Sequence, residues 1–221
     1  ALKNSSDKIF FDSSTTSMRV EFLEKAILHG KHVYCEKPVS ESLENAIKIV
    51  KLAKKNKVKT GVVHDKLYLP GLIKLKRLIE SGFFGKILSL KGEFGYWVFD
   101  GELIKSQRPS WNYKKSEGGG IIKDMLCHWR YVLDNLIAPV KSVSCIGKNN
   151  LSERWGEDGE KYFADADDGA YATFELEGGV IAQINSSWCV RVKREDLVTF
   201  QVDGTKGSAV AGLHNLSLIH I

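Results

Sequence analysis

The chain has 221 residues, of which 43% are hydrophobic and 27% are charged, and its formal net charge is +5. This composition supplies a packed core and is ordinary for a soluble protein of one large or two small domains. The positive charge is mild and its lysines are scattered, so a solvated surface explains it better than a nucleic-acid contact, even in the lysine-rich run at residues 51–59. We expect no nucleic-acid partner.

The cysteines are widely separated in the sequence, at Cys35, Cys127, Cys145 and Cys189. Without a C-x-x-C pair they indicate neither a zinc ribbon nor a disulfide framework, and reduced thiols are expected. The first residues contain no apolar signal core, and no apolar run is long enough to span a bilayer. We therefore expect a cytoplasmic protein that has no membrane partner.

The first third of the chain alternates short apolar strands with amphipathic helices. Strands are predicted at residues 9–11, 31–35 and 59–63. Hydroxyl residues after Asp12 are suited to cap the first helix, and Gly30 ends it. The second helix begins at a capping box that uses either Ser40 or Ser42. Its predicted buried stripe consists of Ala46, Ile47, Ile49, Val50 and Ala53.

This β-α-β-α-β order predicts parallel strands with right-handed crossovers, which is half of a doubly wound sheet. The glycine-rich turn that normally opens such a domain and holds a pyrophosphate does not precede residue 9. We therefore expect that the chain begins within a domain, and that it binds a dinucleotide weakly by itself. We also expect a truncated C-terminus, because residues 213–221 follow no clear pattern.

A different pattern begins at Pro70. It predicts a helix, a strand at residues 86–98, a glycine-rich turn with a helix to Leu136, and then mostly strands: residues 142–147, 169–177, 180–188, 197–202 and 208–210. Long strands joined by short turns predict a large open sheet, mainly antiparallel or mixed. The predicted fold class is thus α/β plus α+β, with domains at residues 1–69 and 70–221.

Lys37 is the first candidate site residue, because it follows a buried strand and precedes Pro38. Ligands of α/β sheets bind at such strand ends, where a half-buried ammonium can transfer a proton or hold an anion. A surface lysine paired with Glu36 is the alternative. His64 and Lys66 follow the third parallel strand and are candidate ligand contacts, with a solvated loop as the alternative.

Asp124 and His128 are spaced to share one face of a helix, and a carboxylate beside a histidine is a common proton-transfer unit. An ordinary surface pair is the alternative, and no third ligand has the spacing of a metal site. The preceding glycines, Gly118–Gly120, have three equally good explanations: a turn that binds a phosphate, a backbone that closely approaches a neighbour, or a flexible segment. The aromatic segment around Arg108 and Trp111 either closes over a ligand or packs in the core.

Several of these tracts together resemble one family. Residues 30–38 resemble the "GKHVxxEKP" signature of the Gfo/Idh/MocA oxidoreductases, the glucose-fructose oxidoreductase and inositol dehydrogenase family. The glycines with Asp124, His128 and Asp134 resemble its "GGGxxxDxxxHxxxxxD" helix, and residues 81–87 are similar to its "xGxxGxI" element. The tract at residues 64–68 departs from the family's common Asn-x-Arg-Phe version.

The resemblance implies an NAD(P)-dependent dehydrogenase acting on a CH–OH group of a sugar, cyclitol or other polyol, with a Rossmann domain and NAD or NADP as cofactor. It implies catalytic roles for Lys37, Asp124 and His128, with His128 as acid/base. Cofactor contacts are implied for Ser13, Thr15, Glu36, Lys37, Arg108 and Trp111, and substrate contacts for His64, Lys66, Asp124 and His128. A homo-oligomer, dimer or tetramer, is expected through the second-domain sheet. The alternative is a non-catalytic relative that binds or regulates.

Overall fold

A computed structural model describes residues 2–220 and divides the chain into two compact units, Ala1–His64 and Asp65–Ile221. The domain limits predicted from the sequence, residues 1–69 and 70–221, stay a prediction.

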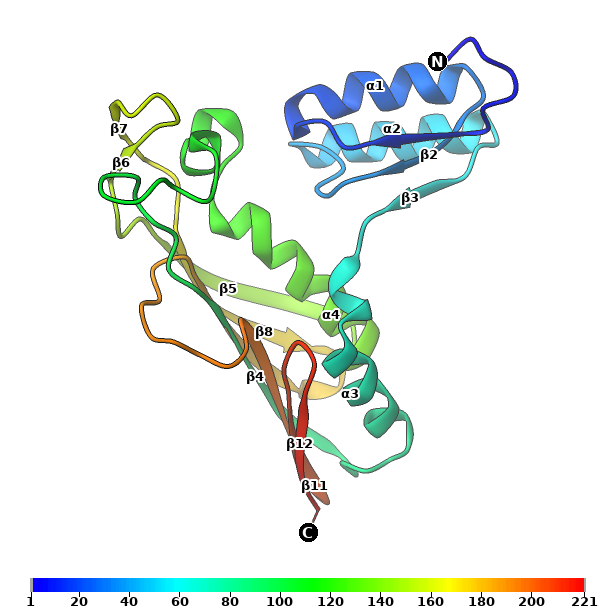
Figure 1. Ribbon diagram of the computed structural model, residues 1–221. Helices are drawn as coiled ribbons and strands as arrows, with labels where there is room; N and C mark the ends of the chain where they lie inside the picture. The colour runs from blue at the N-terminus through cyan, green and yellow to red at the C-terminus, as the bar shows by residue number, and fades with distance from the viewer. Residues whose placement is uncertain (1, 221) are drawn as a thin grey trace. The chain divides into compact units, whose positions relative to one another are not determined.

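The N-terminal unit is a three-stranded parallel sheet with two helices (Figure 1). Strand β2 lies in the middle and pairs in parallel with β1 and with β3, which confirms the predicted β-α-β-α-β arrangement. In chain order the elements are β1 (Ile9–Asp12), α1 (Thr16–Leu28), β2 (His32–Cys35), α2 (Leu43–Lys55) and β3 (Thr60–Val62).

The helix ends follow from local chemistry. Of the two serines that could cap α2, Ser42 is the N-cap, and its side chain accepts the Asn45 N–H at 3.2 Å. Helix α1 begins after Thr15, whose side chain makes no cap bond. Gly30 follows this helix with a φ of 71°, in the left-handed region that favours glycine.

Both helices share one core with the central strand. Leu23 and Ile27 of α1 and Ile49 of α2 are buried in one cluster with Val33 of β2. Alternate strand residues point to the other face, where Ile9, Phe11 and Tyr34 are exposed.

The predicted burial of Ile47 and Val50 is wrong, because these side chains are 44% and 47% exposed. They project away from the line through Ile49 and Ala53 that contacts the core.

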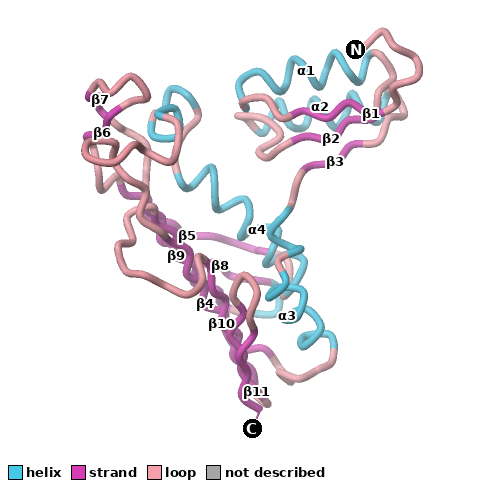
Figure 2. Tube along the Cα trace, viewed as in Figure 1, coloured by secondary structure: helices cyan, strands magenta, loops and turns pink. Residues whose placement is uncertain are grey.

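The C-terminal unit is a large sheet with helices on one side (Figure 2). Its helices are α3 (Pro70–Glu80), a π-helical segment η4 (Ile122–Leu126) and α4 (Cys127–Leu136), and short 3₁₀ turns include η1 (Asp65–Tyr68) and η2 (Ser110–Tyr113). Its strands are β4 (Ile87–Gly95), β5 (Val140–Lys148), β6 (Glu153–Trp155), β7 (Lys161–Phe163), β8 (Gly169–Leu176), β9 (Ile181–Ser187), β10 (Val198–Gly204), β11 (Gly207–Ala211) and β12 (Leu216–His220).

The large sheet has the strand order β12-β11-β10-β4-β9-β8-β5, while β6 and β7 form a separate hairpin. Strands β4 and β9 are parallel and the other neighbours are antiparallel. The predicted open, mixed sheet is thus confirmed. Residues 213–221, for which the sequence indicated no plan, contain strand β12, which pairs with β11.

The core lies between this sheet and its helices. Along β8, Ala170, Ala172 and Phe174 are buried, while Tyr171 between them is 47% exposed on the opposite face. Trp129 of α4 is fully buried, and its indole N–H donates to Ser186 Oγ at 2.8 Å. Among residues 2–220, no helix is both long and apolar enough to cross a bilayer.

Candidate active site

Two loops lie side by side at the carboxyl edge of the three-stranded sheet. Strands β1 and β2 end in register, and the Glu36 N–H donates to the Asp12 carbonyl at 2.9 Å. The loop after β1 carries the exposed Ser13 and Thr15, and the loop after β2 carries the half-buried Glu36 and Lys37. Polar residues therefore gather where open α/β sheets bind their ligands.

Arg19, a buried residue of α1, ties these two loops together. Its Nε donates to Asp12 Oδ2 at 2.7 Å, and its Nη1 and Nη2 donate to the carbonyls of Pro38 and Ser14. Ser14 Oγ donates in turn to Asp12 Oδ1 at 2.7 Å. One guanidinium thus holds the end of β1, the loop that follows it and the turn after Lys37, using donors in a fixed planar geometry.

Cys35, the last residue of β2, is a packing residue. Its side chain is buried, and desolvation raises the pKa of the thiol above its ordinary value. A thiol in that state is a poor nucleophile at neutral pH. The polar side chains that follow it at this strand end are those of the half-buried Glu36 and Lys37.

The glycine triplet of the C-terminal unit allows two backbone segments, residues 111–112 and 119–120, to lie in close contact. A Cβ on Gly119 would lie 2.5 Å from the carbonyl oxygens of both Trp111 and Asn112. Gly120 has a φ of 117° and donates its N–H to the Asn112 carbonyl at 2.9 Å. Of the three roles left open by the sequence, close backbone approach is the one observed. It seats the Trp111 segment against the start of the following helix.

That helix has two parts, which the sequence did not predict. Asp124 lies in the π-helical segment η4, and His128 lies in the first turn of α4. Asp167 Oδ2 accepts the Ile122 N–H at 2.7 Å and so holds the start of the segment. π-Helical turns are rare in proteins, and many of those that occur lie at functional sites.

Asp124 is held by Arg108. Arg108 Nη2 donates to Asp124 Oδ2 at 2.8 Å and to Asn112 Oδ1 at 3.0 Å, and Nη1 donates to Tyr96 Oη at 3.2 Å. The guanidinium carbon lies 4.3 Å from the centroid of the Trp188 ring. Burial lowers the pKa of Arg108. The charge of Asp124, together with the hydrogen bond to Tyr96, outweighs this effect, so the pKa of Arg108 is raised overall. Arg108 is therefore a permanent cation beside the carboxylate.

His128 is buried against η1 and its own helix. Its Nδ1 lies 2.5 Å from Tyr131 Oη and 3.7 Å from Asp65 Oδ1. The Lys66 backbone N–H donates to the same Tyr131 oxygen at 3.2 Å, and the Lys66 ammonium forms an ion pair with Asp65. A histidine with a hydroxyl and a carboxylate at one ring nitrogen is built for proton transfer at the other.

The structure distributes the predicted site residues over both units. Lys37, Ser13, Thr15 and Glu36 share one sheet edge in the N-terminal unit, where His64 is an exposed residue at the end of the unit. In the C-terminal unit the predicted residues Arg108 and Asp124 contact each other. Trp111 is 37% exposed, and Lys66 pairs with Asp65 as described above.

Sequence reasoning missed four residues of these clusters: Arg19, Asp65, Tyr131 and Trp188. Tyr131 had a usable signal, since it stands three residues after His128 and so shares its helical face. Arg19 and Trp188 had none, because each reaches its partners only through tertiary packing.

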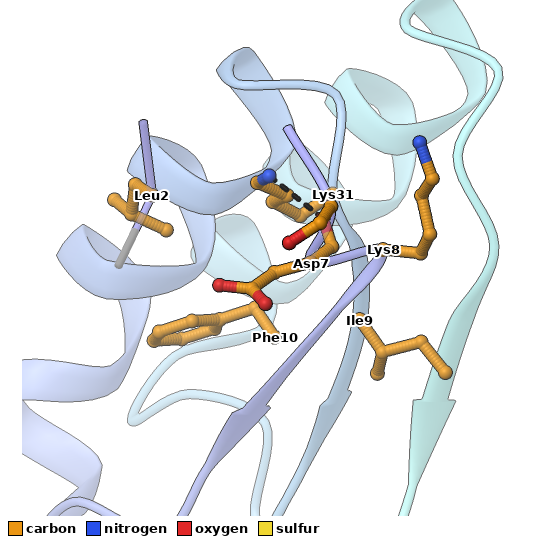
Figure 3. Close-up of a pocket in the computed structure, with 7 residues that line it drawn as sticks. Leu2, Asp7, Lys8, Ile9, Phe10 and Lys31 are labelled. Atoms are coloured by element: carbon orange, nitrogen blue, oxygen red, sulfur yellow. Dashed lines mark hydrogen bonds between the residues drawn. The ribbon is translucent and has the colours of Figure 1, made fainter. Parts of the chain in front are cut away.

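A surface hollow of about 410 Å³ lies at the other end of the small sheet (Figure 3). It is lined by Leu2, Ser6, Asp7, Lys8, Ile9, Phe10 and Lys31. The Lys31 ammonium is engaged by the loop itself, since it donates to the Asp7 carbonyl at 2.7 Å and to the Asn4 carbonyl. The hollow lies at the amino ends of β1 and β2, away from the candidate site residues of the same unit.

Comparison with known proteins gives two matches that together cover most of the chain. Residues 72–210 match the GFO/IDH/MocA C-terminal domain, and residues 9–64 match the oxidoreductase family with an NAD-binding Rossmann fold. The chain belongs to the Gfo/Idh/MocA family of oxidoreductases. The resemblance seen in the sequence motifs is thereby confirmed.

Two relatives are named as sugar dehydrogenases. A D-xylose dehydrogenase of Paenarthrobacter nicotinovorans is 59% identical over 210 residues, which are 93% of this chain and 54% of that protein. A levoglucosan dehydrogenase of Pseudarthrobacter phenanthrenivorans is 26% identical over 82% of this chain and 49% of its own length. The chain thus spans about half the length of these relatives.

Solved structures confirm the fold. An NAD-binding oxidoreductase from Klebsiella pneumoniae superposes with a TM-score of 0.86 at 23% identity, over 99% of this chain and 58% of that one. A levoglucosan dehydrogenase in complex with NADH and L-sorbose gives a TM-score of 0.86 at 22% identity, over 99% of this chain and 59% of that one.

Proposed function

We propose that this chain forms the core of an NAD(P)-dependent dehydrogenase that oxidises a CH–OH group of a sugar. The observation that carries the proposal is the 59% identity to a D-xylose dehydrogenase over 93% of the chain. In this proposal residues 1–69 belong to the cofactor domain, and residues 70–221 bind the sugar.

The residues of the N-terminal unit fit a nicotinamide cofactor. Ser13 and Thr15 present hydroxyls, and Glu36 and Lys37 present charges, on adjacent loops at the carboxyl edge of a parallel sheet. Such an edge is where Rossmann-type sheets bind dinucleotides. NAD or NADP, when bound, supplies the hydride acceptor. We assign cofactor contacts to these four residues, and to Arg108 and Trp111 of the C-terminal unit.

In the proposed reaction the sugar hydroxyl loses its proton to His128 while the carbon beneath it loses a hydride, so that a carbonyl forms. Lys37 holds the hydroxyl oxygen and stabilises the negative charge that develops there. Asp124, fixed by Arg108, orients the sugar through its carboxylate. His64 and Lys66 are assigned to the remaining sugar hydroxyls. Lys37, Asp124 and His128 are thus the proposed catalytic residues.

The assay that tests this proposal uses the complete gene product that encodes this chain. Formation of NADH or NADPH is followed with D-xylose, levoglucosan, myo-inositol and an unrelated alcohol such as ethanol. We expect turnover with D-xylose, and its loss in Lys37→Met and His128→Gln variants that still fold. A folded protein that turns over none of the sugars with either cofactor contradicts the proposal and favours a non-catalytic relative.

We also propose that the open face of the large sheet pairs with a second copy of the chain. Ile146 and Tyr171 are neighbours across β5 and β8 and are 71% and 47% exposed, and Ile181 on β9 is 45% exposed. Sedimentation of the complete protein tests this. We expect the unmodified protein to sediment as an oligomer and the Ile146→Glu, Tyr171→Glu variant to sediment as a monomer. An unmodified protein that is monomeric, or a variant that keeps the mass of the oligomer, contradicts the proposed interface.

We propose a cytoplasmic location on the basis of thiol chemistry. Cys35, Cys145 and Cys189 are free cysteines in the structure. Unpaired thiols are usual where glutathione and thioredoxin keep cysteines reduced, which supports a proposed cytoplasmic location.

A further inference from the structure

The surroundings of His128 contain a chain of hydrogen bonds that the proposed reaction does not yet use. Tyr131 Oη lies 2.5 Å from His128 Nδ1 and accepts the Lys66 backbone N–H at 3.2 Å. Besides burial, a side-chain hydrogen bond with Asp65 is among the causes that raise the pKa of Tyr131, and Asp65 Oδ1 lies 3.7 Å from the same His128 Nδ1. Tyr131 thus stands between an imidazole and a carboxylate.

Counting protons fixes the direction of these bonds. Tyr131 has one hydroxyl proton, and among its described contacts Asp65 and His128 Nδ1 are acceptors for it. The carboxylate is the stronger acceptor, since a charge-assisted bond is about twice as strong as a neutral one. The Tyr131 proton therefore goes to Asp65, and Nδ1 must carry a proton that it donates to Tyr131 Oη.

The charge state of Asp65 is consistent with this order. Partial burial raises the pKa of Asp65, but the hydrogen bond and charge of Lys66 and the charge of His128 outweigh it, so that the net pKa lies below its ordinary value. Burial raises the pKa of Tyr131 above its ordinary value, so its hydroxyl keeps its proton. Asp65 is thus an acceptor and Tyr131 a donor throughout the neutral range.

We propose that Asp65 and Tyr131 are positioning residues that hold the proton of His128 on Nδ1, so that Nε2 carries the lone pair that receives the substrate proton. Nδ1 keeps the same bond when the ring becomes imidazolium, because both ring nitrogens are then donors. The carboxylate of Asp65, 3.7 Å from Nδ1, stabilises the charge that the ring acquires. This inference rests on the proposed function only in naming the substrate as the source of the proton.

Other charged groups near this cluster have partners of their own among the described contacts. On η1 the ammonium of Lys66 pairs with Asp65, and on α4 the neighbouring thiol is that of Cys127. One turn earlier Asp124 is neutralised by Arg108. Because Asp65 Oδ1 lies 3.7 Å from His128 Nδ1, we expect the pKa of His128 to change when the Asp65 carboxylate is removed.

The test is an NMR titration of the histidine ring, which needs neither cofactor nor turnover. The His128 resonances are assigned by their absence in a His128→Gln variant, and their pKa is compared among the unmodified protein, Asp65→Asn and Tyr131→Phe. We expect Asp65→Asn to lower the pKa of His128 by about one unit or more, the effect of losing an opposite charge at this range. Asp158→Asn, on the turn of the β6–β7 hairpin, is the matched control and is expected to change nothing.

Ring nitrogen chemical shifts give the second readout. At a pH where His128 is neutral, the unmodified protein is expected to show the Nδ1–H tautomer, and Tyr131→Phe is expected to move the population toward Nε2–H. The proposal is overturned if the tautomer is Nε2–H in the unmodified protein, or if Asp65→Asn leaves the pKa of His128 unchanged. Since these signals do not depend on catalysis, an inactive protein tests the proposed function separately.

Discussion

Arg108 and Asp124 form an ion pair within the C-terminal unit, with Arg108 Nη2 2.8 Å from Asp124 Oδ2. The pair is one link of a longer stack. Arg108 lies over the Trp188 ring, which packs edge-on against Tyr113 at a centroid distance of 5.6 Å, and the guanidinium of Arg154 lies over Tyr113 at 3.8 Å. Arg154 and Asp168, each 1% exposed, close the stack as a buried ion pair. The proposed orienting carboxylate is thus anchored in the core.

The first prediction concerns Arg108. Arg108→Lys keeps the charge but loses the planar fork that reaches Asn112, Tyr96 and Asp124 together. A lost charge-assisted hydrogen bond is worth about 1.5–3 kcal/mol, so kcat/KM for the sugar should fall about tenfold or more. Steady-state kinetics of the complete protein provide the measurement.

The same variant separates two roles for Arg108. If its main role is to hold Asp124, the dissociation constant for the cofactor stays nearly constant while the sugar kinetics change. If it mainly contacts the cofactor, the cofactor affinity falls instead. Arg194→Lys is the matched control, because Arg194 makes only a 3.7 Å surface pair with Glu93 and should have little effect on either quantity.

The second prediction concerns Arg19. Arg19→Met leaves the carboxylate of Asp12 buried without its cation, and breaking a buried ion pair costs about 3 kcal/mol or more. Amide hydrogen exchange in β1 and β2 is the appropriate measurement, because it reports on the N-terminal unit alone. We expect much faster exchange there, and a smaller effect in an Arg19→Met, Asp12→Asn double variant.

Arg130→Met is the control for this experiment. Arg130 forms an exposed pair with Asp134 in the C-terminal unit, and such pairs contribute little to stability. If exchange in β1 and β2 is equally slow in Arg19→Met and Arg130→Met, Arg19 does not hold the loops after β1 and β2 together.

The third prediction concerns acid stability. The pKa of folded Asp65 lies below its ordinary value of 3.8, so its contribution to stability is present above that pH and is lost as the pH falls through the folded-state value. Asp65→Asn should destabilise the C-terminal unit near neutral pH and converge with the unmodified protein in strong acid.

Tryptophan fluorescence during urea unfolding measures this effect cleanly, because all five tryptophans lie in the C-terminal unit. Asp158→Asn again serves as the control. A difference between Asp65→Asn and the unmodified protein that stays constant from neutral to acid pH would show that the carboxylate charge is irrelevant.

Local patterns were sufficient for most of the fold. The strand ending before Glu36, the helix after Pro70 and the two strands at residues 169–177 and 180–188 were predicted because alternation, helical spacing and short turns are local signals. Strand β12 was missed because Leu216–His220 becomes a strand by pairing with β11. The exposure of Ile47 was missed because periodicity shows an apolar stripe without showing what covers it.

The site residues divide in the same way. Lys37, Asp124 and His128 stood out through short motifs, whereas the contacts that support Asp124 and His128 did not. Arg108 reaches Asp124 across 16 positions and Asp65 reaches His128 across a much longer interval. Such contacts are set by tertiary packing, so the sequence named Arg108 without pairing it with Asp124, and it missed Asp65.

The most direct test of the central claim is hydride transfer from a labelled sugar. The complete gene product is incubated with NAD or NADP in oxidised form and D-xylose that carries deuterium on its carbon atoms, and the reduced cofactor is analysed by mass spectrometry. We expect one deuterium in the recovered NADH or NADPH, at a rate that His128→Gln and Lys37→Met each reduce by about a hundredfold or more. Reduced cofactor without deuterium, or no reduced cofactor from a protein that binds both ligands, would contradict the claim.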